Sequence, residues 1–254
     1  MKNYNTTDLD PQTSFERHVY HRDQFAHYLR WTHVLKCMKI GDTVVDFGCG
    51  KGSLAEVLYR NRFAASLYVG LDIRSKTLDK ARVEFQNVPW IEFIKADLVK
   101  EQVDFFKFNV PPGKHVVSFE VLEHVGKVNG QAFMENFAAC GNENSVFYLS
   151  TPNYDARVGA AGNHTYDSGD GNGVQPQEFT HAEIQALIDP HFDVVEKFGT
   201  FASQKDYKKK IEVWQTKMFQ ALNKYYDSNL VANIMAPMFP EDSRNTMWKL
   251  RLKQ

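Results

Sequence analysis

The sequence is poor in cysteine and has no long apolar run. Its three cysteines, Cys37, Cys49 and Cys140, are odd in number and lack the close spacing of a metal site. Such cysteines are typical of free thiols in a reducing compartment. Residues 1–11 are polar, unlike a secretory signal, and no apolar stretch is long enough to span a membrane. We therefore expect a cytoplasmic protein that does not enter a membrane.

The chain also lacks any large excess of charge. Its formal net charge is -1 over 254 residues, and 43% of the residues are hydrophobic. This composition is that of a globular protein with a substantial core, and it gives no global sign of nucleic-acid binding. No internal repeat and no linker divides the chain, so we expect a single domain over residues 1–254.

What the sequence does contain is a glycine-rich stretch at residues 43–52, TVVDFGCGKG. The pattern predicts a buried strand over residues 43–47, a tight turn over 48–52 and a helix over 53–60. Glycine suits such a turn because it adopts conformations closed to other residues and lets a ligand reach the main chain. The start of the helix offers amide N–H groups to an anionic part of that ligand.

One glycine of the dinucleotide-binding fingerprint G-x-G-x-x-G is missing. The glycine that packs helix against strand would fall at position 53, which is Ser53. Its absence argues against a nicotinamide- or flavin-dependent oxidoreductase.

Downstream of the turn, short apolar runs alternate with helical patterns. The sequence predicts strands over residues 66–72, 90–96, 115–119, 145–150 and 192–199, and helices over 75–85, 133–139 and 179–188. This alternation is the βαβ rhythm of a parallel sheet with right-handed crossovers. A last alternating stretch, residues 246–252, predicts a seventh strand.

Ionisable residues follow three of these strands. Asp72 closes the second strand, about two dozen residues after the glycine turn, where a ribose-binding carboxylate is expected. Asp97 follows the third strand. Glu120, Glu123 and His124 follow the fourth strand, and open α/β sheets place their ligands at this edge.

The segments DFGCGKG, YVGLD, KADL, FEVLEH and STPN together resemble the motifs of class I S-adenosylmethionine-dependent methyltransferases. The resemblance covers roughly residues 40–201. It implies a Rossmann-like, doubly wound α/β fold with a mostly parallel, seven-stranded sheet whose last strand is antiparallel. Around this cofactor-binding core we expect an N-terminal helical segment at residues 1–39 and a helical cap at 203–243, inserted before the last strand.

The resemblance also implies the cofactor, S-adenosyl-L-methionine, and the product, S-adenosyl-L-homocysteine. The residues that it assigns to the cofactor pocket are Asp46, Gly48, Cys49, Gly50, Asp72, Ile73, Asp97, Leu98 and Glu120.

Methyl transfer is an in-line displacement at a sulfonium carbon, so the enzyme chiefly aligns the acceptor and excludes water. A hydroxyl or a protonated amine acceptor also needs a base. Glu123 and His124 are the first candidates, and His164 is the third. His164 belongs to residues 155–177, a long glycine-rich stretch that is either a lid over the site or a plain surface loop.

Two motifs are absent after the fourth strand. There is no N/D-P-P-Y/F/W sequence, typical of the usual amino-methylating DNA enzymes, and no Pro-Cys nucleophile for cytosine C5. We therefore favour O- or N-methylation of a small molecule or metabolite. The alternatives are methylation of ribose or base in RNA or another nucleic acid, and a non-catalytic module that keeps the cofactor pocket.

The spacing of Glu120, Glu123 and His124 also resembles the metal-binding part of small-RNA 3′-terminal ribose methyltransferases. Two carboxylates and an imidazole could hold Mg²⁺ or Mn²⁺. The further histidine of that family would fall at Gln175, so we expect no metal.

Two segments outside the core predict helices. Residues 13–38 show an apolar face formed by Phe15, Val19, Phe25, Tyr28, Leu29, Thr32 and Leu35. We expect Arg30 and His33 on the opposite, solvated face, unless this basic helix closes over the site. Residues 204–231 are rich in lysine. A solvated face is the simpler interpretation, but a nucleic-acid surface could form from Lys205, Lys208, Lys209 and Lys210. Residues 235–244 contain two prolines and should be irregular.

Overall fold

The structure is a computed structural model that describes residues 22–63, 65–100, 112–154, 177–201 and 213–254. A seven-stranded sheet lies at its centre, with the strand order β3-β2-β1-β4-β5-β7-β6. The strands are β1 (Thr43–Phe47), β2 (Leu67–Asp72), β3 (Ile91–Lys95), β4 (His115–Phe119), β5 (Val146–Pro152), β6 (Phe192–Phe201) and β7 (Asn245–Leu252). β7 runs antiparallel to both of its neighbours, and the other pairs are parallel. The predicted fold class is therefore confirmed.

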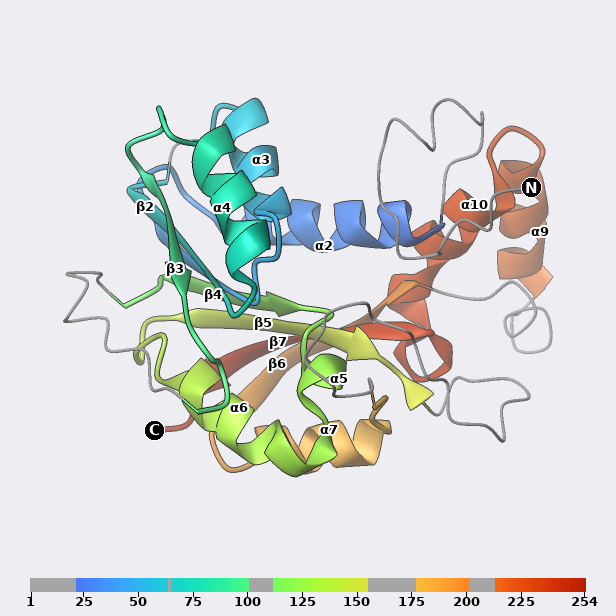
Figure 1. The fold of residues 1–254 in the computed structure, drawn as a ribbon. Helices are drawn as coiled ribbons and strands as arrows, with labels where there is room; N and C mark the ends of the chain where they lie inside the picture. Colours follow the sequence, from blue (N-terminus) through green and yellow to red (C-terminus); the bar gives the residue numbers. More distant parts are fainter. Residues whose placement is uncertain (1–21, 64, 101–111, 155–176, 202–212) are drawn as a thin grey trace, which may run out of the picture.

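Helices cover both faces of the sheet (Figure 1). α2 (Arg22–Cys37), α3 (Ser53–Arg60) and α4 (Ser75–Glu84) lie on one face. The short α5 (Leu122–Val125) and η1 (Lys127–Asn129) lead into α6 (Gly130–Ala138), which covers the other face together with α7 (His181–Ile188). None of the described helices combines the length and the apolarity that a membrane span requires.

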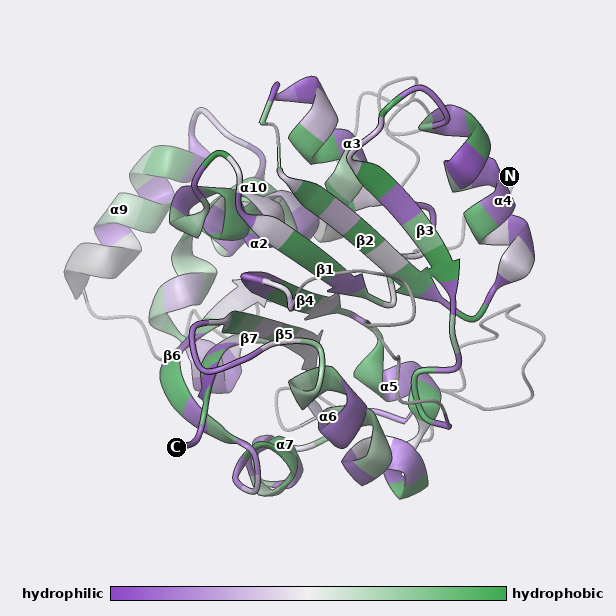
Figure 2. Cartoon of the chain, turned by 90° about the vertical axis from the view of Figure 1, so that its left-hand side faces the viewer, coloured by the Kyte–Doolittle hydropathy of each residue, from purple (hydrophilic) through white to green (hydrophobic). Residues whose placement is uncertain are grey.

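The central strands are buried because side chains alternate between two covered faces. In β1, Val45 and Phe47 belong to the hydrophobic cluster under α6 and α7, whereas Val44 belongs to the cluster under α2, α3 and α4. Figure 2 shows the largely hydrophobic strands between helices that carry hydrophilic residues on their outer sides. The observed strands agree with the predicted ones to within two residues at each end.

The N-terminal helix buries a different face from the predicted one. The buried stripe consists of Ala26, Arg30, Val34 and Met38, whereas Tyr28 is 46% exposed. The sequence prediction placed Arg30 and His33 in solvent, but Arg30 is buried and His33 is half-buried. The prediction was wrong because it ranked residues by hydropathy, while Arg30 is buried as the partner of a carboxylate at the end of β4.

The cap contains α9 (Val213–Asn223) and α10 (Ser228–Met235), which share a small apolar cluster around Phe219, Val231 and Met235. The segment after α10 was predicted to be irregular, and this prediction was wrong. It forms two short 3-10 helices, η3 (Ala236–Met238) and η4 (Pro240–Asp242). α10 contacts α2 and β6, so the cap rests on both the N-terminal helix and the sheet.

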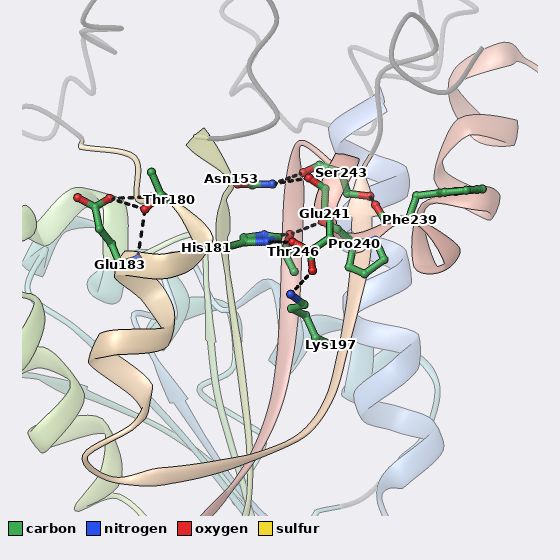
Figure 3. A network of polar contacts seen from close by, with 10 residues as sticks. All are labelled: Asn153, Thr180, His181, Glu183, Lys197, Phe239, Pro240, Glu241, Ser243 and Thr246. Carbon is green, nitrogen blue, oxygen red and sulfur yellow. Dashed lines mark hydrogen bonds and ion pairs between the residues drawn. The ribbon is translucent and has the colours of Figure 1, made fainter. Parts of the chain in front are cut away.

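A polar network fastens η3 and η4 to the core (Figure 3). Ser243 donates a hydrogen bond to the carbonyl of Phe239 at 2.7 Å, and Asn153 at the end of β5 donates to the carbonyl of Ser243 at 3.1 Å. The ring of His181 contacts Glu241 at 2.6 Å. Lys197 pairs with the same carboxylate. Burial opposes the charged form of Glu241, but the bonds from Lys197 and His181 outweigh it and lower the pKa of Glu241.

The close approach of β6 to this segment predicts a cost for any side chain at Gly199. An added Cβ would overlap the Ser243 hydroxyl and the carbonyl of Ala236, which is main chain and cannot rotate away. We expect Gly199→Ala to lower the free energy of unfolding by about 1–3 kcal/mol in urea denaturation. The exposed Val195→Ala in the same strand is the control and should stay within about 0.5 kcal/mol of the parent. Equal stability of the two variants would contradict the packing described.

Candidate functional site

The glycine turn after β1 has the left-handed backbone that its sequence predicts. Gly48, Gly50 and Gly52 have φ values of 96°, 56° and 80°. At Gly48 an added Cβ would overlap the side chain of Val121, so this glycine is needed for close packing. At Gly50 it would meet the flexible guanidinium of Arg74 at 3.4 Å. Gly50 is therefore the position of the turn where the main chain is open to an approaching group.

Asp72, at the end of β2, is bound directly to this turn. Its Oδ2 accepts the N–H of Gly50 at 2.9 Å, and its Oδ1 accepts the N–H of Arg74 at 2.8 Å. The Arg74 guanidinium adds two longer bonds, at 3.1 and 3.2 Å. A carboxylate has about four acceptor directions, so these four donors saturate Asp72. The Arg74 side chain is 38% exposed, and a ligand hydroxyl could take its place at the carboxylate.

Asp46, on β1, is buried beneath the turn. It accepts a 2.6 Å hydrogen bond from the Tyr68 hydroxyl. Burial raises the pKa of Asp46 to about 7, the Tyr68 bond opposes the shift, and the nearby charge of Asp72 adds to it. Asp46 is therefore a buried group that can gain or lose a proton near neutral pH.

The other residues predicted for the pocket differ in what their side chains can reach. Ile73 is 39% exposed next to Asp72 and could pack on a flat ring. Asp97 accepts the main-chain N–H of Val99 at 3.1 Å, so its carboxylate also shapes its own turn. The side chains of Cys49 and Leu98 lie in the two hydrophobic clusters. Those two residues could therefore contact a ligand only through their main chain.

Glu120 follows β4 with a φ of 57°, which is uncommon for a residue with a side chain. Its carboxylate accepts a 2.8 Å hydrogen bond from Ser150 on β5, and another from Asn245. Nη1 of Arg30, on α2, lies 3.3 Å from Glu120 Oε1 and forms an ion pair with it. Because β7 is antiparallel, its first residue, Asn245, reaches the edge at which β5 ends.

Glu123 and His124 lie together on α5, as predicted, but their environments differ. Glu123 is buried and accepts a hydrogen bond from Thr151 at 3.1 Å. Burial, and next the charge of Glu120, raise the pKa of Glu123 well above its ordinary range. His124 is 39% exposed, and its Nε2 lies 4.0 Å from Glu123 Oε1. Burial therefore favours the neutral form of Glu123, and His124 is the accessible member of the pair.

Several predicted residues lie outside the described part of the chain: His164 and Lys205, Lys208, Lys209 and Lys210. Within the described part, no group of three His, Cys, Asp or Glu side chains could hold a metal ion. Sequence reasoning did not single out Arg74, and it brought Arg30 to the site only in the alternative in which the basic helix closes over it. The spacing of Ala26, Arg30 and Val34, four residues apart on one helical stripe, was the available signal for Arg30.

Comparison with known proteins identifies the class. A family model described as "Methyltransferase domain" matches residues 20–227. The chain therefore belongs to the methyltransferase-domain family, and S-adenosylmethionine is the cofactor that its sequence motifs imply. The turn at Gly50, the acceptor at Asp72 and the exposed Ile73 fit the ribose and adenine of this cofactor.

Individual relatives are more distant. Sphingolipid C9-methyltransferase 2 of Gibberella zeae is 31% identical in an alignment of 124 residues that covers 44% of this chain and only 22% of that protein. An S-adenosylmethionine-dependent methyltransferase from Mesorhizobium loti has a TM-score of 0.57 at 19% identity, covering 91% of this chain and 99% of its own. Magnesium protoporphyrin IX methyltransferase from Synechocystis PCC 6803, with bound S-adenosylhomocysteine, has a TM-score of 0.55 at 17% identity, covering 100% and 90%. These structures share the fold.

The buried carboxyl of Asp46 predicts a pH-dependent stability. Its pKa is raised, so between about pH 4 and pH 7 the folded protein keeps a proton that the unfolded chain releases. Raising the pH through this window therefore removes stability. Asp46→Asn stays neutral, so its stability relative to the parent should increase from pH 5 to pH 8 in urea denaturation. The exposed Asp193→Asn is the control, and a parallel course of all three proteins would contradict the assignment.

Proposed function

We propose that the chain transfers the methyl group of S-adenosylmethionine to a hydroxyl or amine of a small molecule, at the carboxyl edge of strands β1 to β5. The observation that carries the proposal is the 2.9 Å contact between Gly50 and Asp72, which joins an open glycine turn to a carboxylate. A ribose diol needs an acceptor of this kind, and the adjacent main chain leaves room for a ligand.

The residues along this edge divide between the two ends of the cofactor. Asp72, Ile73 and Asp97 would hold the adenosine end, with Leu98 and Cys49 contributing their main chain. The glycine turn, Asp46 and Glu120 would hold the cationic amino-acid end. The bound cofactor supplies an activated methyl group, and the protein contributes alignment, exclusion of water and removal of a proton.

In the chemical step we assign the proton acceptor to His124. His124 is half-buried and lies on α5, the short helix that follows Glu120 and the end of β4. Burial and the charge of Glu120 favour the protonated form of Glu123, so we assign it the role of a buried neutral group beside the imidazole rather than that of the base. His164 remains a third candidate for this step.

A small-molecule acceptor is supported by the relative named for a sphingolipid and by the absence of the nucleic-acid methyltransferase motifs. The chain matches only about a fifth of that relative, so a lipid acceptor is one member of a class that also includes soluble hydroxyls and amines. The lysines that would favour an RNA acceptor, Lys205, Lys208, Lys209 and Lys210, lie outside the described residues. A screen for the acceptor should therefore test nucleic acids as well as small molecules.

The cofactor assignment predicts opposite effects of two neighbouring substitutions. Asp72→Asn should weaken S-adenosylhomocysteine binding at least about tenfold, or about 1.4 kcal/mol. Arg74→Ala should tighten it, because the guanidinium no longer competes for the Asp72 carboxylate. Isothermal titration calorimetry measures both, with the exposed Asp79→Asn as the control.

Weaker binding by Arg74→Ala would show that Arg74 supports the ligand rather than competing with it. Failure of the parent protein to bind S-adenosylhomocysteine would overturn the cofactor site itself.

The base assignment predicts a difference between the two residues of α5. His124→Ala should leave cofactor binding nearly unchanged and lower turnover about a hundredfold, the usual scale for a lost acid–base group. Glu123→Gln should lower turnover much less, because glutamine mimics a neutral carboxyl. The assay is release of S-adenosylhomocysteine with an acceptor selected from lipids, soluble hydroxyls, amines and RNA. A larger loss of turnover in Glu123→Gln than in His124→Ala would identify Glu123 as the base.

A further inference from the structure

Arg30 is a buried cation at the edge where the site lies. Its side chain is 2% exposed, and its Nη1 lies 3.3 Å from both Glu120 Oε1 and the Thr200 hydroxyl. Its Nε is buried without a hydrogen-bond partner among the described atoms. Burying a guanidinium with an unsatisfied donor is unfavourable unless its charge is compensated. The ion pair with Glu120 supplies that compensation.

Glu120 is held on several sides in an uncommon conformation. Its left-handed φ of 57° is unfavourable for a residue with a side chain and persists only where the surroundings fix it. Ser150, Asn245 and Arg30 all contact its carboxylate, from β5, β7 and α2 respectively. Its main-chain N–H also donates to the carbonyl of Ser150 at 2.9 Å. Among these contacts, Arg30 is the one that brings a charge.

The surrounding helix is part of the same arrangement. His27, one turn before Arg30 on α2, is half-buried. Its pKa is lowered, first by removal from water and then by the charges of Arg30 and Lys51, which oppose its protonation. Lys51 belongs to the glycine turn, and Thr200 lies on β6, so this part of α2 is near both the turn and the end of β6. α2 also contacts α10, so it connects the cap to the end of β4.

We propose that Arg30 is a positioning residue: through its ion pair it holds the Glu120 carboxylate in the orientation that receives the cationic amino-acid end of the cofactor. The inference rests on the proposed function, since it assumes that Glu120 faces the cofactor. The inference adds that α2 contributes to cofactor binding. Without α2, the adenosine pocket would remain, but Glu120 would no longer be held in place to bind the amino-acid end of the cofactor.

A purely structural ion pair would merely fix α2 to the sheet. Two ligands separate the alternatives. S-adenosylhomocysteine carries the amino-acid end, whereas 5′-methylthioadenosine has the same adenosine and sulfur without it. Loss of a positioning residue weakens the first ligand and spares the second. Loss of a structural residue weakens both together.

The experiment compares full-length variants by calorimetry with both ligands, together with thermal unfolding. Arg30→Met should bind S-adenosylhomocysteine at least about tenfold more weakly and 5′-methylthioadenosine within about twofold of the parent. Arg30→Lys keeps the charge and should lose less. Glu120→Gln should show the same selectivity as Arg30→Met, and the double variant should be no weaker than either single variant, because the two residues act as one unit.

Thr200→Val is the matched control, since Thr200 bonds Arg30 and the main-chain carbonyl of Asn245 but not Glu120 itself. It should leave the ratio of the two affinities unchanged. Equal weakening of both ligands by Arg30→Met, or no weakening of either, overturns the positioning role while leaving the cofactor site in place. If the parent protein binds neither ligand, the proposed function fails and this inference fails with it.

Discussion

The placement of carboxylates at the carboxyl edge of the sheet is the constraint on which the site depends. Asp46, Asp72 and Glu120 lie at or near the carboxyl ends of neighbouring strands, and carboxylates at such partly buried positions need compensation for their charge. Each is treated differently. Asp46 is buried and gains a proton near neutral pH, Asp72 is saturated by main-chain and guanidinium donors, and Glu120 is paired with a buried arginine.

The need to compensate these three carboxylates explains why elements far apart in the sequence meet at this edge of the sheet. The glycine turn supplies an N–H to Asp72, α2 supplies a cation to Glu120, and the antiparallel β7 brings the amide of Asn245 to the same carboxylate. The network around Ser243 then fixes the segment that leads into β7. The cap is thus attached next to the residues that we assign to the amino-acid end of the cofactor.

Much of the fold was predictable because it follows from local patterns. The unit of β1, turn and α3 has the predicted bounds, since a buried apolar strand, three glycines and a helical period leave few other structures. The buried face of α2 was not predictable from hydropathy, because Arg30 is buried by a partner 90 residues away. For the same reason the candidate site could be predicted only in part. Asp72 stands at a position set by the topology of the sheet, whereas Arg74 joins the candidate site only because its side chain turns back to the Asp72 carboxylate.

The sequence also could not separate Glu123 from His124. They are neighbours in the chain, and their difference lies in burial, which depends on the packing of α5 against β5. The most direct test of the account is a crystal structure with S-adenosylhomocysteine bound. We predict the ribose hydroxyls within hydrogen-bonding distance of Asp72, the Arg74 guanidinium displaced, and the ligand ammonium beside a Glu120 still paired with Arg30. A ligand bound elsewhere, or an amino-acid end that points away from β4, would contradict it.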